Sequence, residues 1–176
     1  MNVVSQLEQA VRTIPDFPEP GIQFKDITPI LKDAVLLQSV VHELIHPYRS
    51  MRVDKVVGME SRGFILGAMV AVELGAGFVP VRKKGKLPYK TMIEHYELEY
   101  GTDSLEMHVD AIDSGDAVLV HDDVIATGGT AAATCKMVKR AGGNVVGCSF
   151  LIELGFLNGR NKLEELTESI HAVLRY

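Results

Sequence analysis

The apolar positions of the chain switch between helical spacing and short continuous runs. Leu7, Val11 and Ile14 recur at helical spacing and predict an N-terminal helix that ends at Pro15. Helices are also expected over residues 34–46, 63–74 and 127–141. Short apolar runs predict strands over residues 53–58, 78–81, 117–120, 144–154 and 169–174. This alternation indicates an α/β fold with a central parallel β-sheet flanked by helices.

Two segments depart from that alternation. In residues 91–109, apolar and polar side chains alternate on both sides of Gly101, which predicts an antiparallel hairpin inserted into the fold. Pro15, Pro18, Pro20 and Gly21 favour an irregular segment, so residues 1–33 are expected to form an N-terminal arm. A chain of 176 residues can bury one ordinary core, and we therefore expect a single domain over residues 1–176.

Composition and charge narrow the class of protein. A formal net charge of -5 disfavours general nucleic-acid binding. The longest apolar stretch, residues 64–72, is too short to cross a bilayer, and the N-terminal residues lack the pattern of a secretory signal. We therefore expect a cytoplasmic protein that does not bind membranes. Cys135 and Cys148 lie in apolar patterns, which favours small buried side chains over a disulfide or a zinc site.

The segment AVLVHDDVIATGGT, residues 117–130, carries the clearest chemistry. It places Asp122 and Asp123 at the end of an expected buried strand, and its small residues open the next helix. Backbone N–H groups and the positive end of a helix bind phosphate, whereas ionised carboxylates accept hydrogen bonds from sugar hydroxyls. The combination predicts a site for a phosphorylated sugar. A lone TGG would indicate only a capped turn, and no Lys-Ser/Thr follows the glycines as in a nucleotide-triphosphate loop.

Cations follow two other expected strands. Arg62 lies in the turn after residue 58, and Arg82, Lys83 and Lys86 follow residue 81. Ligands bind beyond the carboxyl ends of parallel strands, so these side chains are candidates to neutralise a second polyanion such as pyrophosphate. For the lysines alone, a solvated charge run is the favoured interpretation.

Two histidine motifs suggest other chemistry. His42 and His46 fit the zinc helix signature H-E-x-x-H, but they fall opposite the apolar stripe of their helix, which favours a chance pairing on a solvent face. His121 directly precedes the acid pair. Asp122 could hold it in the charged form, although a structural role on the other face of the sheet is the default expectation.

The segment VLVHDDVIATGGT resembles the phosphoribosyl pyrophosphate motif of the type I phosphoribosyltransferases. Further segments resemble the adenine phosphoribosyltransferases within that family, and the similarity runs in order from about residue 15 to residue 160. These segments are PEPGIQFKDITP from residue 18, ESRGF from residue 60, RKKGKLP from residue 82 and LEYG from residue 98. The chain departs from the family pattern at His121, where an apolar residue is common, and at Lys25, where arginine is frequent.

The resemblance implies a type I phosphoribosyltransferase fold with a hairpin lid at residues 91–109 and a small N-terminal hood. It also implies an enzyme that converts adenine and phosphoribosyl pyrophosphate, with Mg²⁺, to AMP and pyrophosphate in a homodimer. Mg²⁺ would be held mainly by substrate and water, with no direct protein ligand assigned.

The resemblance also assigns roles to individual residues. The phosphoribosyl group would be held by Asp122, Asp123, Ala126, Thr127, Gly128, Gly129 and Thr130, and the pyrophosphate by Arg62, Arg82, Lys83, Lys86 and Tyr100. Adenine would lie between Phe24 and Leu154, with Gln23, Lys25 and Arg62 beside it. The catalytic set would be Glu99, Asp122, Asp123 and Arg62. Glu99 resembles the proposed acid/base of the family, although a solvent-facing carboxylate is almost as good an interpretation.

Two rival functions remain at this level. One is a regulator that senses phosphoribosyl pyrophosphate without chemistry, which should carry a helix-turn-helix domain or a broad basic face. The other is a phosphoribosyltransferase for a 6-oxopurine, which usually places a donor such as lysine near the oxo group.

Overall fold

The structure is a computed structural model that describes residues 2–97 and 101–176. The chain divides into two compact units, Met1–Glu43 and Leu44–Tyr176. The boundary falls inside a helix, beyond the predicted arm at residues 1–33. A single domain over the whole chain stays a prediction.

The N-terminal unit contains short elements. In chain order they are α1 (Val3–Ala10), β1 (Arg12–Pro15), β2 (Gln23–Asp26), α2 (Thr28–Leu31) and α3 (Ala34–Ile45). The prediction of one helix up to Pro15 is wrong, because β1 pairs antiparallel with β2 and sets Ile14 opposite Phe24. The helix expected from Ala34 is confirmed, and it ends at Ile45 just before the 3-10 turn η1 (His46–Tyr48).

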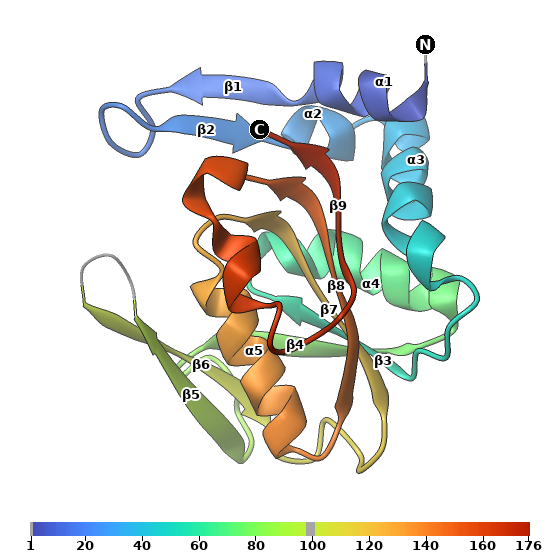
Figure 1. The fold of residues 1–176 in the computed structure, drawn as a ribbon, viewed down its shortest axis with the longest axis vertical. Helices are drawn as coiled ribbons and strands as arrows, with labels where there is room; N and C mark the ends of the chain where they lie inside the picture. The colour runs from blue at the N-terminus through green and yellow to red at the C-terminus, as the bar shows by residue number, and fades with distance from the viewer. Residues whose placement is uncertain (1, 98–100) are drawn as a thin grey trace. The chain divides into compact units, whose positions relative to one another are not determined.

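The second unit is built on a seven-stranded sheet in the order β5-β6-β4-β3-β7-β8-β9 (Figure 1). The strands are β3 (Lys55–Met59), β4 (Gly77–Lys83), β5 (Thr91–Glu97), β6 (Thr102–His108), β7 (Ala117–Ile125), β8 (Asn144–Glu153) and β9 (Ile170–Arg175). From β4 to β9 each neighbouring pair is parallel, whereas the β5–β6 hairpin joins β4 antiparallel. The parallel sheet and the inserted hairpin are thus confirmed.

Two strands continue further than the sequence suggested. β7 runs through Asp122 and Asp123 to Ile125, because its backbone goes on pairing with β8 as far as Glu153. β4 runs through Arg82 and Lys83, because both residues pair with β6. These four side chains were expected on loops after the strands, and the structure places them within the strands.

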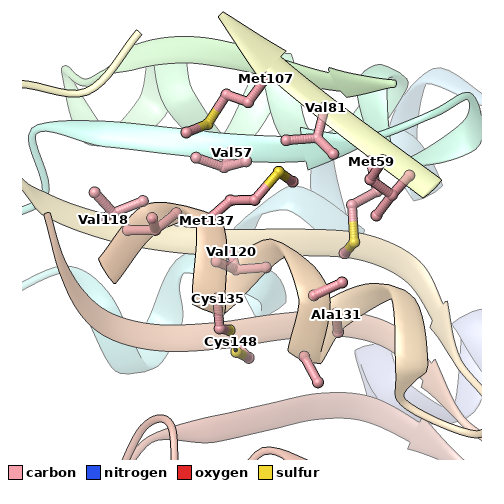
Figure 2. Packing of buried hydrophobic residues seen from close by; sticks show 14 of the residues in the cluster. Val57, Met59, Val81, Met107, Val118, Val120, Ala131, Cys135, Met137 and Cys148 are labelled. Carbon is pink, nitrogen blue, oxygen red and sulfur yellow. Dashed lines mark hydrogen bonds between the residues drawn. The ribbon is translucent and has the colours of Figure 1, made fainter. Parts of the chain in front are cut away.

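Two helices sandwich the sheet, α4 (Arg62–Leu74) on one face and α5 (Gly129–Arg140) on the other (Figure 1). Figure 2 shows the core beneath α5, where Met137 lies among Val57, Val118 and Val120 of the sheet. Cys135 is fully buried there, and its sulfur lies 3.6 Å from that of Cys148 with no disulfide bond. Both cysteines are therefore small core side chains, as predicted.

Membrane contact is a separate matter. Among the helices of the described residues, none combines the length and the apolar character that a membrane span requires.

Candidate active site

The carboxyl ends of neighbouring parallel strands form the candidate site. β3 lies between β4 and β7, so the turn after β3 and the end of β7 meet at one edge of the sheet. They enclose a cavity of about 440 Å³ lined by Glu60, Ser61, Arg62, Asp122, Asp123, Val124 and Ala126. Four residues predicted from sequence are brought together in this cavity.

A second, smaller cavity lies directly beside the first and shares Asp122 with it. It has a volume of about 90 Å³ and is lined by Asp122, Val124, Ile125, Ala126, Thr127, Gly128, Gly129, Thr130 and Ala131. Gly128 caps the start of α5 with φ of 75°, a conformation that glycine adopts without strain. The free N–H groups of the first helical turn and the positive end of the helix therefore face a pocket of anion size. All five residues predicted for a phosphate line it.

The acid pair lies at the junction of the two cavities. Asp123 is 3% exposed, and its Oδ2 lies 2.6 Å from Nε of Arg62. Asp122 Oδ1 accepts a hydrogen bond from the Asp123 N–H at 2.9 Å. Burial raises the pKa of Asp122 well above its usual range, and the charge of Asp123 adds to this rise. A half-buried carboxylate, Asp122, and a buried one, Asp123, are thus held side by side, and an arginine balances the charge of Asp123.

Cations on the β4 side of the site are already engaged by carboxylates. Glu60 accepts hydrogen bonds from Arg82 Nε at 3.2 Å and from the Lys83 N–H at 2.7 Å. Lys83 Nζ lies 3.1 Å from Asp103 Oδ2, and this contact raises the pKa of the lysine. The Ser104 N–H and then Lys83 lower the pKa of Asp103. These predicted pyrophosphate ligands lie near the site but do not line either cavity.

Glu106 organises the loop that carries Lys86. It is 3% exposed, and its Oε1 accepts hydrogen bonds from the N–H groups of Lys86 at 2.8 Å and Leu87 at 2.7 Å. Burial alone would raise the pKa of Glu106, but the backbone donors outweigh it and lower the pKa. An ionised carboxylate therefore fixes the backbone of the 84–87 loop.

The hairpin lies against the start of α5. A Cβ at Gly129 would come within 3.3 Å of Tyr96 Cδ2, and the Tyr96 hydroxyl donates to Asp103 at 3.3 Å. The Tyr96 side chain also forms a hydrogen bond with that of Thr130, and burial raises the pKa of the Tyr96 hydroxyl. Glu99 and Tyr100, the predicted acid/base and pyrophosphate ligand, lie outside the described residues.

The predicted adenine ligands belong to both units. Gln23, Phe24 and Lys25 lie on β2, where Lys25 Nζ donates to Thr13 Oγ1 at 3.0 Å and the ring of Phe24 packs edge-on against Phe17 at 5.1 Å. Leu154 follows β8 and donates its N–H to the Ile125 carbonyl at 2.9 Å. Because Phe24 and Leu154 belong to different units, an adenine sandwich between them stays a prediction.

The histidines separate cleanly by burial. His42 and His46 are exposed, as expected, and His46 lies past the end of α3. His121 is completely buried beside α4, and burial lowers its pKa to about 4. The idea that Asp122 could hold His121 charged is therefore wrong, since the imidazole is neutral near pH 7.

The sequence analysis missed residues that support the site. The ESRGF segment could have indicated Glu60 and Ser61, because they directly precede Arg62 in the turn. Asp103 and Glu106 gave no signal, since acidic residues on an alternating strand normally face solvent. Gly159 also gave none, although the structure places it against the 126–130 loop.

Comparison with known proteins gives the class of protein that carries this fold and site. Residues 48–166 match the phosphoribosyl transferase domain family. The adenine phosphoribosyltransferase of Flavobacterium johnsoniae is 53% identical over 97% of this chain and 99% of its own. The crystal structure of that enzyme from Rhodothermus marinus is 61% identical with a TM-score of 0.95, covering 99% of this chain and 98% of its own.

A third relative carries ligands. The adenine phosphoribosyltransferase of Saccharomyces cerevisiae, crystallised with adenine and an imino-altritol bisphosphate, is 40% identical with a TM-score of 0.91, and the match covers 98% of each chain. The chain belongs to the adenine phosphoribosyltransferase family, whose members are transferase enzymes.

Proposed function

We propose that the protein transfers the phosphoribosyl group of phosphoribosyl pyrophosphate to adenine, giving AMP and pyrophosphate in purine salvage. One observation carries this proposal. The anion-sized pocket at the start of α5 and the larger cavity share Asp122, so a sugar can span them with its phosphate in the first. Ala126 to Thr130 would bind the 5′-phosphate, and the carboxylates of Asp122 and Asp123 would accept hydrogen bonds from the ribose hydroxyls.

Pyrophosphate would leave toward the cations around the larger cavity. Arg62 lines that cavity, and Arg82, Lys83 and Lys86 lie on the neighbouring strand and loop. The resemblance adds Tyr100 to this set. Arginine and lysine stabilise the negative charge that develops as the bond between C1′ and oxygen breaks.

The acid pair also fits a magnesium ion that enters with the substrate. The described part of the chain holds no group of three or more side chains that could cage a metal ion. Asp122 and Asp123 nevertheless present hard oxygens to the larger cavity, and Mg²⁺ commonly binds one or two carboxylates, water and substrate phosphate. They would hold the ion directly or through water, and its charge would stabilise the leaving pyrophosphate.

Bond cleavage leaves an oxocarbenium-like sugar that water would attack. The 91–109 hairpin is proposed to shield it, since the described part of this hairpin lies against α5 at Gly129. Adenine would be bound by Gln23, Phe24, Lys25, Arg62 and Leu154. Glu99 would move the proton of the adenine ring as general acid/base.

Assembly and location remain part of the proposal. We expect a cytoplasmic homodimer in which lysines of one subunit can serve the site of the other. The net charge of -5 supports the further expectation that nucleic acid is not a partner.

An activity assay tests the proposal. Adenine with phosphoribosyl pyrophosphate and Mg²⁺ should yield AMP and pyrophosphate, whereas hypoxanthine and guanine should be poor acceptors. The purines are offered together and the nucleotides separated by chromatography. Binding of phosphoribosyl pyrophosphate without AMP formation would indicate a sensor, and dominant IMP or GMP would indicate a 6-oxopurine enzyme; either result contradicts the proposal.

A further inference from the structure

The 126–130 loop rests on a second turn that comes from the far end of the chain. This turn is η3 (Gly159–Lys162), which follows η2 (Gly155–Leu157) after β8. A Cβ at Gly159 would lie 2.7 Å from the N atom of Gly128 and 2.9 Å from the carbonyl carbon of Thr127. Conversely, a Cβ at Gly128 would lie 2.9 Å from the carbonyl carbon of Gly159. The two backbones are therefore in direct contact, with no room for a side chain on either.

Backbone contacts of this kind cannot relax as the end of a flexible side chain does. The atoms that Gly159 meets belong to the peptide units that carry the N–H groups of Thr127 and Gly128, directly before α5 begins at Gly129. Gly159 itself does not line the adjacent pocket of about 90 Å³. It lies behind the wall of that pocket, against Thr127 and Gly128, which both line it.

The turn is itself fixed by an ion pair between the half-buried Arg160 and the buried Glu153. Arg160 donates from Nε to Glu153 Oε1 at 3.1 Å and from Nη2 to Glu153 Oε2 at 2.6 Å. A third hydrogen bond runs from Arg160 Nη1 to the Ile170 carbonyl at 2.9 Å. Glu153 is 4% exposed, and Arg160 lowers its pKa, so the carboxylate stays ionised at neutral pH. Such a two-pronged pair adds geometric precision as well as energy.

We propose that Gly159, locked in place by the Glu153–Arg160 pair, is a positioning residue for the 5′-phosphate. The backbone of Gly159 contacts the 126–130 loop on the side away from the pocket. This contact holds the N–H groups of the loop at the positions that an anion requires. This inference rests on the proposed function of the loop. It predicts a defect confined to the phosphate end of the substrate, because Gly159 meets the 126–130 loop, whereas the cations proposed for pyrophosphate lie on β4 and on the loop after it.

The replacement Gly159→Ala tests the proposal. We expect binding of ribose 5-phosphate to weaken by about 10–100-fold, which corresponds to one lost hydrogen bond to a charged group, while pyrophosphate binding changes by less than about 2-fold. The KM for phosphoribosyl pyrophosphate should rise, and the KM for adenine should stay constant. Calorimetry and steady-state kinetics measure both. Equal weakening of both ligands, or of neither, would overturn the proposal.

Two further variants secure the result against misfolding. Gly77→Ala is the matched control, because the nearest atom to its Cβ, at 3.2 Å, is Cδ of the flexible Lys55 side chain, and it should bind both ligands as the parent does. Arg160→Lys keeps the charge but loses the two-pronged geometry, and it should weaken ribose 5-phosphate binding by about 3–10-fold. An Arg160→Lys protein with unchanged ribose 5-phosphate binding would also overturn the proposal.

A variant of the 126–130 loop separates the positioning role of Gly159 from the proposed binding of the 5′-phosphate by that loop. Replacing Thr127 and Thr130 together by valine removes two hydroxyl donors from the loop while Gly159 stays in place. If this variant binds ribose 5-phosphate normally, the two threonine hydroxyls do not hold the 5′-phosphate and the proposed function loses that assignment. If it binds weakly while Gly159→Ala binds normally, only the positioning role is refuted.

Discussion

The two sides of the candidate site are constructed in different ways. On the α5 side, the pocket is walled by backbone, by small residues and by the mutual contact of Gly128 and Gly159. On the β4 side, the expected anion ligands are long cationic side chains, and Arg82 and Lys83 already have carboxylate partners in the free protein.

This difference bears on how a substrate would enter. An anion at the start of α5 meets donors that already point into the pocket, so little has to rearrange. A pyrophosphate on the β4 side has to compete with Glu60 and Asp103 for the cations. The α5 side should therefore set the position of the sugar, and the β4 side should adjust to the charge of the leaving group.

The acids on the two sides also differ in the direction of their pKa shifts. Burial raises the pKa of Asp122 well above its usual range. On the other side, hydrogen bonds and Lys83 lower the pKa of Asp103, and three backbone N–H groups lower that of Glu106. Folding therefore opposes ionisation of Asp122 and favours ionisation of the carboxylates that hold the cations.

The largest expected effect comes from removing both charges of the acid pair. The double change Asp122→Asn and Asp123→Asn should lower kcat/KM for phosphoribosyl pyrophosphate by about 10²–10⁴-fold, since each hydrogen bond to a charged group contributes about 1.5–3 kcal/mol. Steady-state kinetics give the number, and circular dichroism checks the fold. Asp110→Asn, at an exposed position, is the control. Turnover close to that of the parent protein would refute the ribose role.

A smaller effect is expected on the β4 side from Glu106→Gln. A neutral amide accepts less strongly from the Lys86 and Leu87 N–H groups, so the 84–87 loop should loosen. We expect pyrophosphate binding to weaken by about 2–10-fold, as for one ordinary hydrogen bond, and ribose 5-phosphate binding to stay constant. Titration calorimetry with each ligand measures both.

The control for this variant is Glu94→Gln on the same hairpin. Glu94 pairs with Arg140 of α5 at 2.7 Å, whereas Glu106 accepts from the 84–87 loop, so loss of the Glu94 charge should leave pyrophosphate binding unchanged. If Glu94→Gln weakens pyrophosphate binding as much as Glu106→Gln, the hairpin as a whole is responsible and the two-sided description of the site is wrong.

The sequence predicted the α5 side better than the β4 side, for a physical reason. A loop that binds an anion through its backbone needs small residues at fixed positions next to the start of a helix. The segment ATGGT meets this requirement in the sequence itself. Hydrophobic periodicity likewise revealed the parallel strands, both covering helices and the hairpin. Strand ends were less visible, because the pairing that extends β7 to Ile125 depends on β8 rather than on local composition.

Long-range contacts account for what the sequence did not reveal. Glu106 accepts from residues 19 and 20 positions away, and Gly159 reaches a loop that precedes it by an entire helix and strand. Neither partner is marked by spacing or by a motif. The sequence pattern predicted a helix as far as Pro15 for a related reason: residues 12–15 form a strand only through their pairing with β2.

The smallest expected effect is on stability, and it has opposite signs on the two sides. The pKa of Asp122 is raised in the folded protein, so its contribution to the free energy of unfolding is present below the unfolded value of about 3.9 and is lost as the pH rises through the folded pKa. The melting temperature of Asp122→Asn should therefore exceed that of the parent protein by a margin that grows between pH 4 and pH 8, by roughly 2–4 °C for each 1 kcal/mol regained.

The pKa of Glu106 is lowered, so its contribution is present above the unfolded value of about 4.3 and is lost as the pH falls through the folded pKa. Glu106→Gln should accordingly melt furthest below the parent at pH 8, and scanning calorimetry at pH 4, 6 and 8 compares the two. Parallel pH profiles for both variants would show that the acids on the two sides do not differ as their burial and hydrogen bonds require.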